Sequence, residues 1–139
     1  MYLLDTNVVS ELRRKKPHGA VVAWLSSIAD DNLFLSAVTL AEIQAGIELT
    51  RDQNPQRANE LESWLELVAD TYNILSMDGD VFRLWAKLMH KRSDTLYEDA
   101  MIAATARAKN LTVVTRNVID FEHFDVEIIN PFDYTENLL

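Results

Sequence analysis

Short apolar runs alternate with longer helical segments along the chain, a pattern that few folds accommodate. Five largely apolar runs lie at residues 2–4, 33–35, 74–75, 111–114 and 126–129, with longer segments between them. Strands that alternate with helices form parallel sheets whose faces the helices cover. The sequence therefore predicts an α/β fold with a central parallel sheet of about five strands.

The longer segments repeat apolar residues at the spacing of amphipathic helices. Apolar residues recur at intervals of three and four within 20–28, 55–68 and 81–88. Asp78 and Asp80 precede the last of these and are its candidate N-caps. We expect a helix over each of the three segments.

The length of the chain favours a single domain. Its 139 residues suffice for one buried core and are short for two. Only three glycines and three prolines occur, and no linker, repeat or low-complexity segment is evident. Residues 133–139 show neither helical nor strand period. We therefore expect one domain at 1–132 and a C-terminal tail at 133–139.

Composition excludes several kinds of site. Cysteine is absent, which excludes disulfides, thiolate nucleophiles and zinc–thiolate sites and fits a reducing cytoplasm. The three histidines, His18, His90 and His123, lie at unrelated spacings and are expected at the surface. No run approaches the roughly 18 apolar residues of a membrane span, and no signal peptide is evident. We expect a cytoplasmic protein with no membrane segment.

The charge balance argues against non-specific binding of nucleic acids. Thirteen basic residues stand against 22 acidic ones, a net charge of −9, whereas such binding depends on a basic surface. An acidic site can still reach phosphates through divalent cations. The basic cluster at 13–16 is either a solvated loop or a patch that contacts phosphates.

Acidic residues follow the first two predicted strands, and parallel sheets bind ligands outside the carboxyl ends of their strands. Asp5 has no lysine or arginine next to it, although a lone desolvated carboxylate is costly. Glu42 lies in the helix after the second run. The residues at helical spacings from it are apolar: Val38, Ala41, Ala45 and Leu49. We therefore expect Glu42 at or near the buried face of that helix.

Two later segments bring further acids and amides to the same edge. Glu98 and Asp99 stand in the first turn of an alanine-rich helix that can pack very close to a neighbour. The fourth run is followed by Thr115 and Asn117, and then by Asp120. Acids at a helix start also suit the helix dipole alone, so a structural role for Asp99 and Asp120 stays open.

A cluster of carboxylates suggests metal chemistry. Carboxylates without cations repel one another, and a metal ion relieves that repulsion. Ligands that are all oxygen select Mg²⁺ or Mn²⁺, and such a site suits hydrolysis of phosphodiesters by activated water. An aspartate at a strand end can also be a phosphotransfer nucleophile. A haloacid-dehalogenase-type site would need Asp-x-Asp, whereas this chain has Asn7.

Four segments in order resemble the PIN domain, and specifically the VapC-type ribonuclease toxins of bacterial toxin–antitoxin pairs. They read LLDTNVVSEL (3–12), LSAVTLAEIQAGI (35–47), EDAMIAATARAKNLTVVTRN (98–117) and DF (120–121). The closing INPF (129–132) resembles the FitB-like subgroup. This resemblance implies a three-layer α/β/α sandwich, usually dimeric, with an acidic site that depends on Mg²⁺ or Mn²⁺.

Carried over by position, the acids of the family fall on Asp5, Glu42 and Asp99. These residues would hold the metal ion. Glu42 would either bind the ion or orient the attacking water. The small polar residues that would line or support the site are Thr6, Asn7, Ser36 and Thr115. Many relatives carry Asp where this chain has Asn117, and Asp120 is the candidate for that carboxylate. Binding of a second ion is therefore left open.

The resemblance implies an endoribonuclease toxin, a homodimer, and a cognate VapB-type antitoxin whose C-terminal segment covers the acids. Apolar residues around Trp24 or Trp64 would receive that segment, or belong to the core or the dimer contact. Arg13, Arg14 and Arg116 are candidate contacts to the RNA backbone. The alternatives are a non-catalytic PIN-like interaction module and an aspartate-based phosphatase or phosphotransfer domain.

Overall fold

The computed structural model describes residues 1–135. Its strands are β1 (Tyr2–Leu4), β2 (Leu33–Ser36), β3 (Asn73–Leu75), β4 (Thr112–Val114) and β5 (Ile128–Ile129). Its α-helices are α1 (Thr6–Glu11), α2 (Gly19–Ser26), α3 (Ala37–Gln53), α4 (Pro55–Thr71), α5 (Gly79–Met89), α6 (Tyr97–Lys109) and α7 (Val118–Glu122). Short 3-10 helices are η1 (Asp30–Asn32), η2 (Asp94–Leu96) and η3 (Pro131–Asp133).

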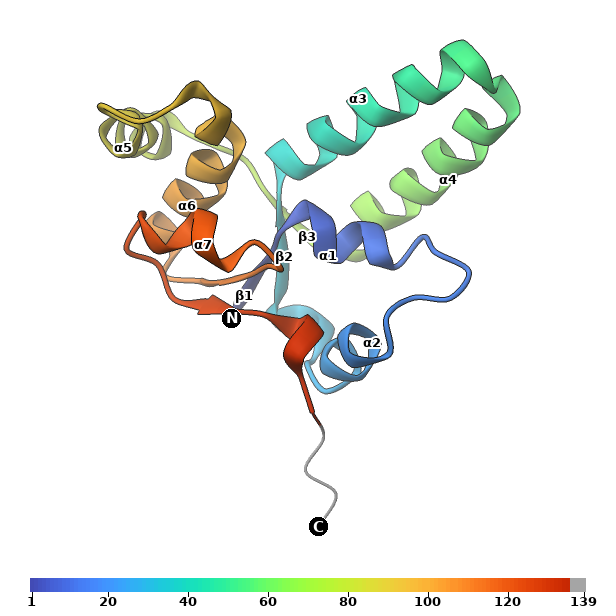
Figure 1. Ribbon diagram of the computed structural model, residues 1–139, viewed down its shortest axis with the longest axis horizontal. Coiled ribbons are helices and arrows are strands. Elements are labelled where there is room, and N and C mark those ends of the chain that lie inside the picture. Colours follow the sequence, from blue (N-terminus) through green and yellow to red (C-terminus); the bar gives the residue numbers. More distant parts are fainter. Residues whose placement is uncertain (136–139) are drawn as a thin grey trace.

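All five strands run parallel in the order β3-β2-β1-β4-β5, which confirms the predicted α/β class (Figure 1). The chain moves outward from β1 to β2 and β3, and then returns to place β4 on the other side of β1. Open parallel sheets bind ligands outside the strand ends where the order reverses in this way. Asp5 and Thr115 directly follow the two strands at that point.

Helices cover both faces of the sheet, as expected for strands that are apolar on both sides. Successive residues of a strand point to opposite faces. Leu3 and Val113 pack with residues of α6 and α7, while Leu4 and Val114 pack with residues of α1, α2 and α4. The predicted three-layer sandwich is confirmed.

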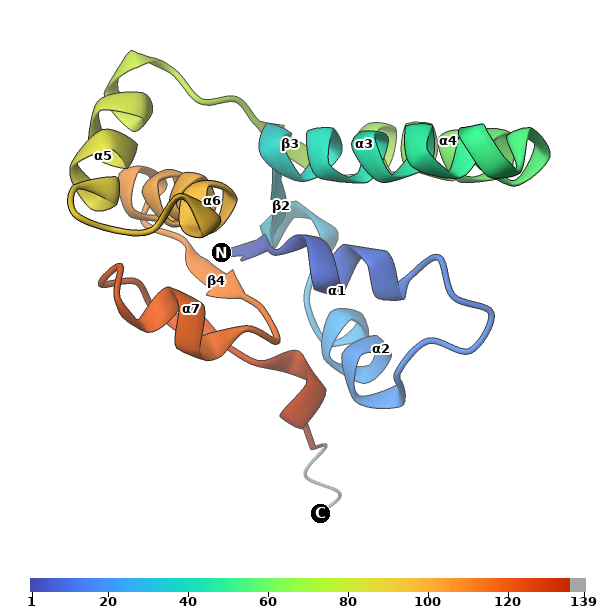
Figure 2. The same ribbon diagram turned by 45° about the horizontal axis from the view of Figure 1, so that its top comes forward.

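Helices α3 and α4 form a hairpin that projects away from the sheet (Figure 2). The buried residues inside it are Ile47, Ala58 and Leu65. Toward its tip, Arg51 bonds to Glu48 at 3.2 Å and to Glu62 at 2.8 Å, so one cation ties the two helices together. The base of α3 stays at the edge of the sheet and carries Glu42.

The face of α3 that meets the core differs from the expected one. The exposed residues on the expected face are Ala41, Ala45 and Leu49. Helix α3 has a second apolar stripe, Ile43 and Ile47, and α4 covers that stripe. Glu42 lies beside the covered stripe and is half-buried, as expected, although for a different packing reason.

The C-terminal segment packs on the domain as far as the structure describes it. Pro131 is buried, and Phe132 and Tyr134 pack against the core that includes α2. The predicted tail at 133–139 lies partly outside the described residues, so its role and the domain limit at 132 stay predictions. Within residues 1–135, no helix is long and apolar enough to cross a membrane.

Candidate active site

Asp5 is the buried centre of the site. Its backbone N–H extends the sheet by donating to the Val114 carbonyl at 2.9 Å. Its side chain accepts three hydrogen bonds, from the Thr6 N–H at 2.8 Å, the Thr115 hydroxyl at 2.8 Å and the Asn7 amide at 3.1 Å. Only 4% of Asp5 is exposed, and it forms no ion pair within the described part of the chain. These bonds fix the carboxylate without neutralising it.

The residues around Asp5 form a continuous network. Thr115 is fully buried at the end of β4, and its hydroxyl oxygen accepts from the Asn7 amide at 3.3 Å and from the Asn117 N–H at 3.0 Å. The side-chain oxygen of Asn7 in turn accepts from the Arg116 N–H at 3.1 Å. The segment after β4 is therefore tied to the segment after β1 by side-chain bonds.

Glu42 points from α3 toward the first turn of α1. The Thr6 hydroxyl lies 3.2 Å from the Glu42 Oε1 and 3.2 Å from the Thr39 hydroxyl. Thr39 is buried and was not identified from the sequence, although its i−3 spacing from Glu42 places both on one face of the helix. Ser36 has a different role, since it caps α3 by accepting from the Val38 N–H at 3.1 Å.

Asp99 enters the site from α6. This helix packs closely on its neighbours through alanines that are fully buried: Ala100, Ala103, Ala104 and Ala106. Asp99 is half-buried in the first turn, whereas the adjacent Glu98 is exposed. Of the two acids at this helix start, Asp99 is therefore the one placed against the interior of the site.

Asp120 approaches from α7. It is half-buried in the first turn, and its negative charge contributes to raising the pKa values of Asp5 and Asp99. Asn117 is exposed at the start of α7, where its side chain makes no capping hydrogen bond. This edge of the site therefore presents one carboxylate and one uncharged amide.

Burial and mutual repulsion raise the pKa values of three carboxyls. Burial raises the pKa of Asp5, against three hydrogen bonds that lower it, and repulsion from Asp120 adds to the rise. Burial, and then repulsion from Asp5, raise the pKa of Glu42 to about 7 and that of Asp99 to about 6. Groups from three separate segments thus share one electrostatic environment.

The side-chain atoms that could bind a metal ion at this site fit a hard divalent cation. They are all oxygen atoms, and the three histidines are exposed. Within residues 1–135, no group of three His, Asp or Glu side chains lies close enough together to hold a metal ion in the observed arrangement. Mg²⁺ keeps several of its waters when bound, so spaced carboxylates such as Asp5, Glu42 and Asp99 suit it. A cation there would also relieve the repulsion that raises their pKa values.

The cation-free chain should lose stability as the pH rises. In EDTA we expect the free energy of unfolding to fall by roughly 2 kcal/mol between about pH 4.5 and about pH 7.5, after discounting for the half exposure of the groups. A carboxyl whose pKa is raised on folding binds its proton more tightly in the folded chain. Stability is therefore lost as the pH rises from the ordinary values of 4.5 and 3.8 through about 7 for Glu42 and about 6 for Asp99.

Urea unfolding at the two pH values measures this effect. Glu42→Gln and Asp99→Asn should each flatten the pH dependence, whereas Asp31→Asn, at an exposed acid of η1, should not. Millimolar Mg²⁺ should restore stability at the higher pH, since it binds the folded chain. An equal pH dependence in the parent and in both site variants would contradict the assignment.

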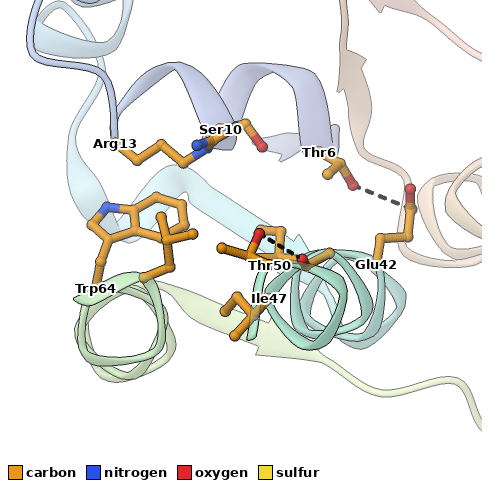
Figure 3. A pocket seen from close by; sticks show the side chains of 10 residues that line it. Thr6, Ser10, Arg13, Glu42, Ile47, Thr50 and Trp64 are labelled. Carbon is orange, nitrogen blue, oxygen red and sulfur yellow. Dashed lines mark hydrogen bonds between the residues drawn. The ribbon is translucent and has the colours of Figure 1, made fainter. Parts of the chain in front are cut away.

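A hollow beside Glu42 separates α1 from the α3–α4 hairpin (Figure 3). The residues on its α1 side are Thr6, Ser10 and Arg13, and those on the hairpin side include Ile47, Thr50 and Trp64. One wall is therefore polar and the other largely apolar. Arg13 faces the same hollow as the Glu42 carboxylate.

The other residues proposed from the sequence lie in different surroundings. Arg14 is exposed, and its Nε lies 3.8 Å from the Glu11 carboxylate. Arg116 is exposed beside Asn117 in the segment that follows β4. Trp24 is buried in the core with 5% exposure, so it offers no surface to a partner.

Comparison with known proteins gives a consistent result. The PIN domain family matches residues 2–127. Plasmid stability protein StbB of Pseudomonas syringae pv. tomato is 38% identical, over 96% of this chain and 99% of its own. Toxin FitB of Neisseria gonorrhoeae is 37% identical, over 95% and 99%. VapC ribonuclease Y4jK of Sinorhizobium fredii is 38% identical, over 96% and 99%.

Solved structures share the fold. The crystal structure of FitAcB from Neisseria gonorrhoeae superposes with a TM-score of 0.84 at 37% identity, over 96% of this chain and 99% of that one. VapBC-5 from Mycobacterium tuberculosis, described as a member of the VapBC family of toxin–antitoxin systems, superposes with a TM-score of 0.62 at 31% identity, over 92% and 96%.

Proposed function

The chain belongs to the PIN domain family, and we propose from this that it is a metal-dependent endoribonuclease, the toxin of a bacterial toxin–antitoxin pair. Relatives named as a toxin and as a ribonuclease align with nearly the whole chain. The observation that carries the proposal is the buried Asp5 carboxylate, which is held by three hydrogen bonds and which, after burial, is the next cause that raises the pKa values of Glu42 and Asp99.

Bound by Asp5, Glu42 and Asp99, Mg²⁺ or Mn²⁺ would neutralise these carboxylates and promote the attack of water on a phosphodiester. The chain contributes a fixed geometry, since Asp5 cannot rotate without breaking its bonds to Thr115 and to the backbone of α1. Glu42 would either bind the ion or orient the attacking water. The Thr6 hydroxyl holds one oxygen of Glu42 in place.

Asp120 and Asn117 define the remaining edge of the site. We assign Asp120 as the fourth carboxylate, since it is half-buried in the first turn of α7 and repels both Asp5 and Asp99. Asn117 offers an amide to the substrate and brings no charge. Ser36 and Thr115 support the site indirectly, through the start of α3 and through Asp5.

A VapB-type antitoxin is the expected partner, because a solved relative is described as part of a toxin–antitoxin system. The hollow between α1 and the hairpin would receive its inhibitory segment, since that hollow joins a polar wall and an apolar wall beside Glu42. We also propose that the chain forms a homodimer, which the resemblance implies.

Incubation of the purified chain with total cellular RNA tests this function. We expect discrete cleavage products with Mg²⁺ or Mn²⁺ and none in EDTA, and growth arrest when the chain is expressed without an antitoxin. Intact RNA and normal growth with a folded protein would favour a non-catalytic interaction module. Release of phosphate from a small phosphomonoester, without RNA cleavage, would favour an aspartate-based phosphatase.

A further inference from the structure

Phe132 of η3 packs against an arginine at the edge of the acidic site. The Arg116 guanidinium carbon lies 4.5 Å from the centre of the Phe132 ring, within cation–π distance. The same ring packs in an edge-type arrangement with His18 at the start of α2, with ring centres 5.1 Å apart. Asn130 fixes the turn by accepting from the Phe132 N–H at 3.0 Å. The closing INPF segment is thus built into a surface next to the site.

Arg116 is bound to the site at its backbone. Its N–H donates to the side-chain oxygen of Asn7, and it directly follows Thr115, which bonds to Asp5. Its side chain lines a hollow together with Asn117, Asp120, Asn130 and Asp133. Arg116 is therefore a cation at the edge of the acidic site, beside the hollow that includes Asp120.

A cation at this position reduces the electrostatic repulsion between the acidic site and an approaching polyanion. The chain carries a net charge of −9 and gathers its carboxylates where a polyanion must approach. An arginine contacts phosphate through two parallel N–H groups, but its long side chain loses much conformational freedom when it does so. An aromatic ring under the guanidinium limits that freedom in advance and leaves the N–H edge free for a ligand.

We propose that Arg116 binds a backbone phosphate of single-stranded RNA beside the acidic site, and that Phe132 is a positioning residue that holds Arg116 for this contact. The inference rests on the proposed nuclease function. It gives the C-terminal turn a part in substrate binding, although the turn supplies none of the proposed catalytic groups.

The test is binding of a labelled single-stranded RNA of mixed sequence in EDTA, followed over a range of salt concentrations. Arg116→Ala should weaken binding about tenfold and lower the slope of log Kd against log salt by about 0.7, the change for one phosphate contact on a single strand. Phe132→Leu should weaken binding about two- to fivefold, and Phe132→Trp, which keeps an aromatic face, should restore it. In the Arg116→Ala background, Phe132→Leu should have no further effect.

Arg92→Ala is the matched control. Arg92 also packs on a phenylalanine, with its guanidinium carbon 5.1 Å from the Phe124 ring centre, but it lies after α5 and bonds to the His123 carbonyl. This variant should bind RNA like the parent. Melting temperatures of all variants are measured alongside, and a loss of binding that follows the loss of stability across the set would show a purely structural role.

Cleavage assays separate this proposal from the function on which it rests. With Mg²⁺, Arg116→Ala and Phe132→Leu should raise KM and leave kcat within about twofold, since the phosphate contact is made in both the ground state and the transition state. Cleavage by the parent with unchanged RNA affinity and salt slope in Arg116→Ala would overturn the phosphate contact alone. Absence of cleavage by the parent would contradict the nuclease function, while the binding data would still decide the role of Arg116.

Discussion

Replacing Asp5 with asparagine should lower the rate of metal-dependent RNA cleavage by at least about 10³-fold. The substitution removes the negative charge at the point where β1 ends and the strand order of the sheet reverses. It also removes the repulsion that helps to raise the pKa values of Glu42 and Asp99. The lost charge weakens the attraction of the site for a divalent cation by more than the easier ionisation of Glu42 and Asp99 strengthens it, and within the described residues no nearby carboxylate has the same three supports.

The fold of this variant should persist. Asparagine has nearly the same shape and keeps an oxygen that can accept from the Thr6 N–H. Loss of the buried charge offsets the poorer fit of an amide against the Asn7 amide. We expect a melting temperature within a few degrees of the parent, and unchanged RNA affinity in EDTA.

The measurement is kcat/KM on a labelled RNA with saturating Mg²⁺, next to a thermal melt of the same preparation. Asp31→Asn, which removes an exposed acid from η1, is the control and should cleave at the rate of the parent. An Asp5→Asn protein that is folded and cleaves as fast as the control would show that Asp5 is not the anchor of the cation.

Much of the fold could be predicted because its parallel strands are apolar on both faces. The runs at 2–4, 33–35 and 74–75 each lie in a strand. Asp78, one of the two candidate N-caps, caps α5. The end of the sheet was harder to delimit, since 126–129 contributes only Ile128–Ile129 as strand. The local sequence pattern shows which residues can form a strand, whereas pairing with β4 determines which of them form β5.

The packing and hydrogen bonds around the acids could not be predicted, because they depend on contacts between segments that are far apart in the sequence. Helix α3 has two apolar stripes, and only the packing of α4 decides that Ile43 and Ile47 turn inward while Leu49 stays exposed. The bond from Thr115 to Asp5 joins residues 110 positions apart. Acids at the strand ends could therefore be proposed from topology, but the hydroxyls that fix them required the fold.

Asp99 and Glu98 are adjacent acids at one helix start, and replacing each by its amide should have very different results. Asp99→Asn should reduce cleavage by about 10³-fold or more, because Asp99 is half-buried among the site carboxylates and would bind the cation. Glu98→Gln should change cleavage by no more than about twofold, since an exposed charge is screened by solvent. Both substitutions remove one negative charge from the same turn of α6, so a helix-dipole effect would act on both alike.

The pair therefore separates a role as cation ligand from a role at the helix end. Cleavage rates, growth arrest on expression and the Mg²⁺-dependent rise in melting temperature are measured for both variants. For Asp99→Asn we expect loss of all three, and for Glu98→Gln we expect all three to be kept. Similar losses in the two variants would support the dipole explanation, and loss only in Glu98→Gln would move the third acid of the site by one residue. A role for Glu98 as the cation ligand in place of Asp99 would conflict with the burial of Asp99. The half-buried Asp99 carboxyl would then be repelled by Asp5 and Asp120 with no cation to compensate.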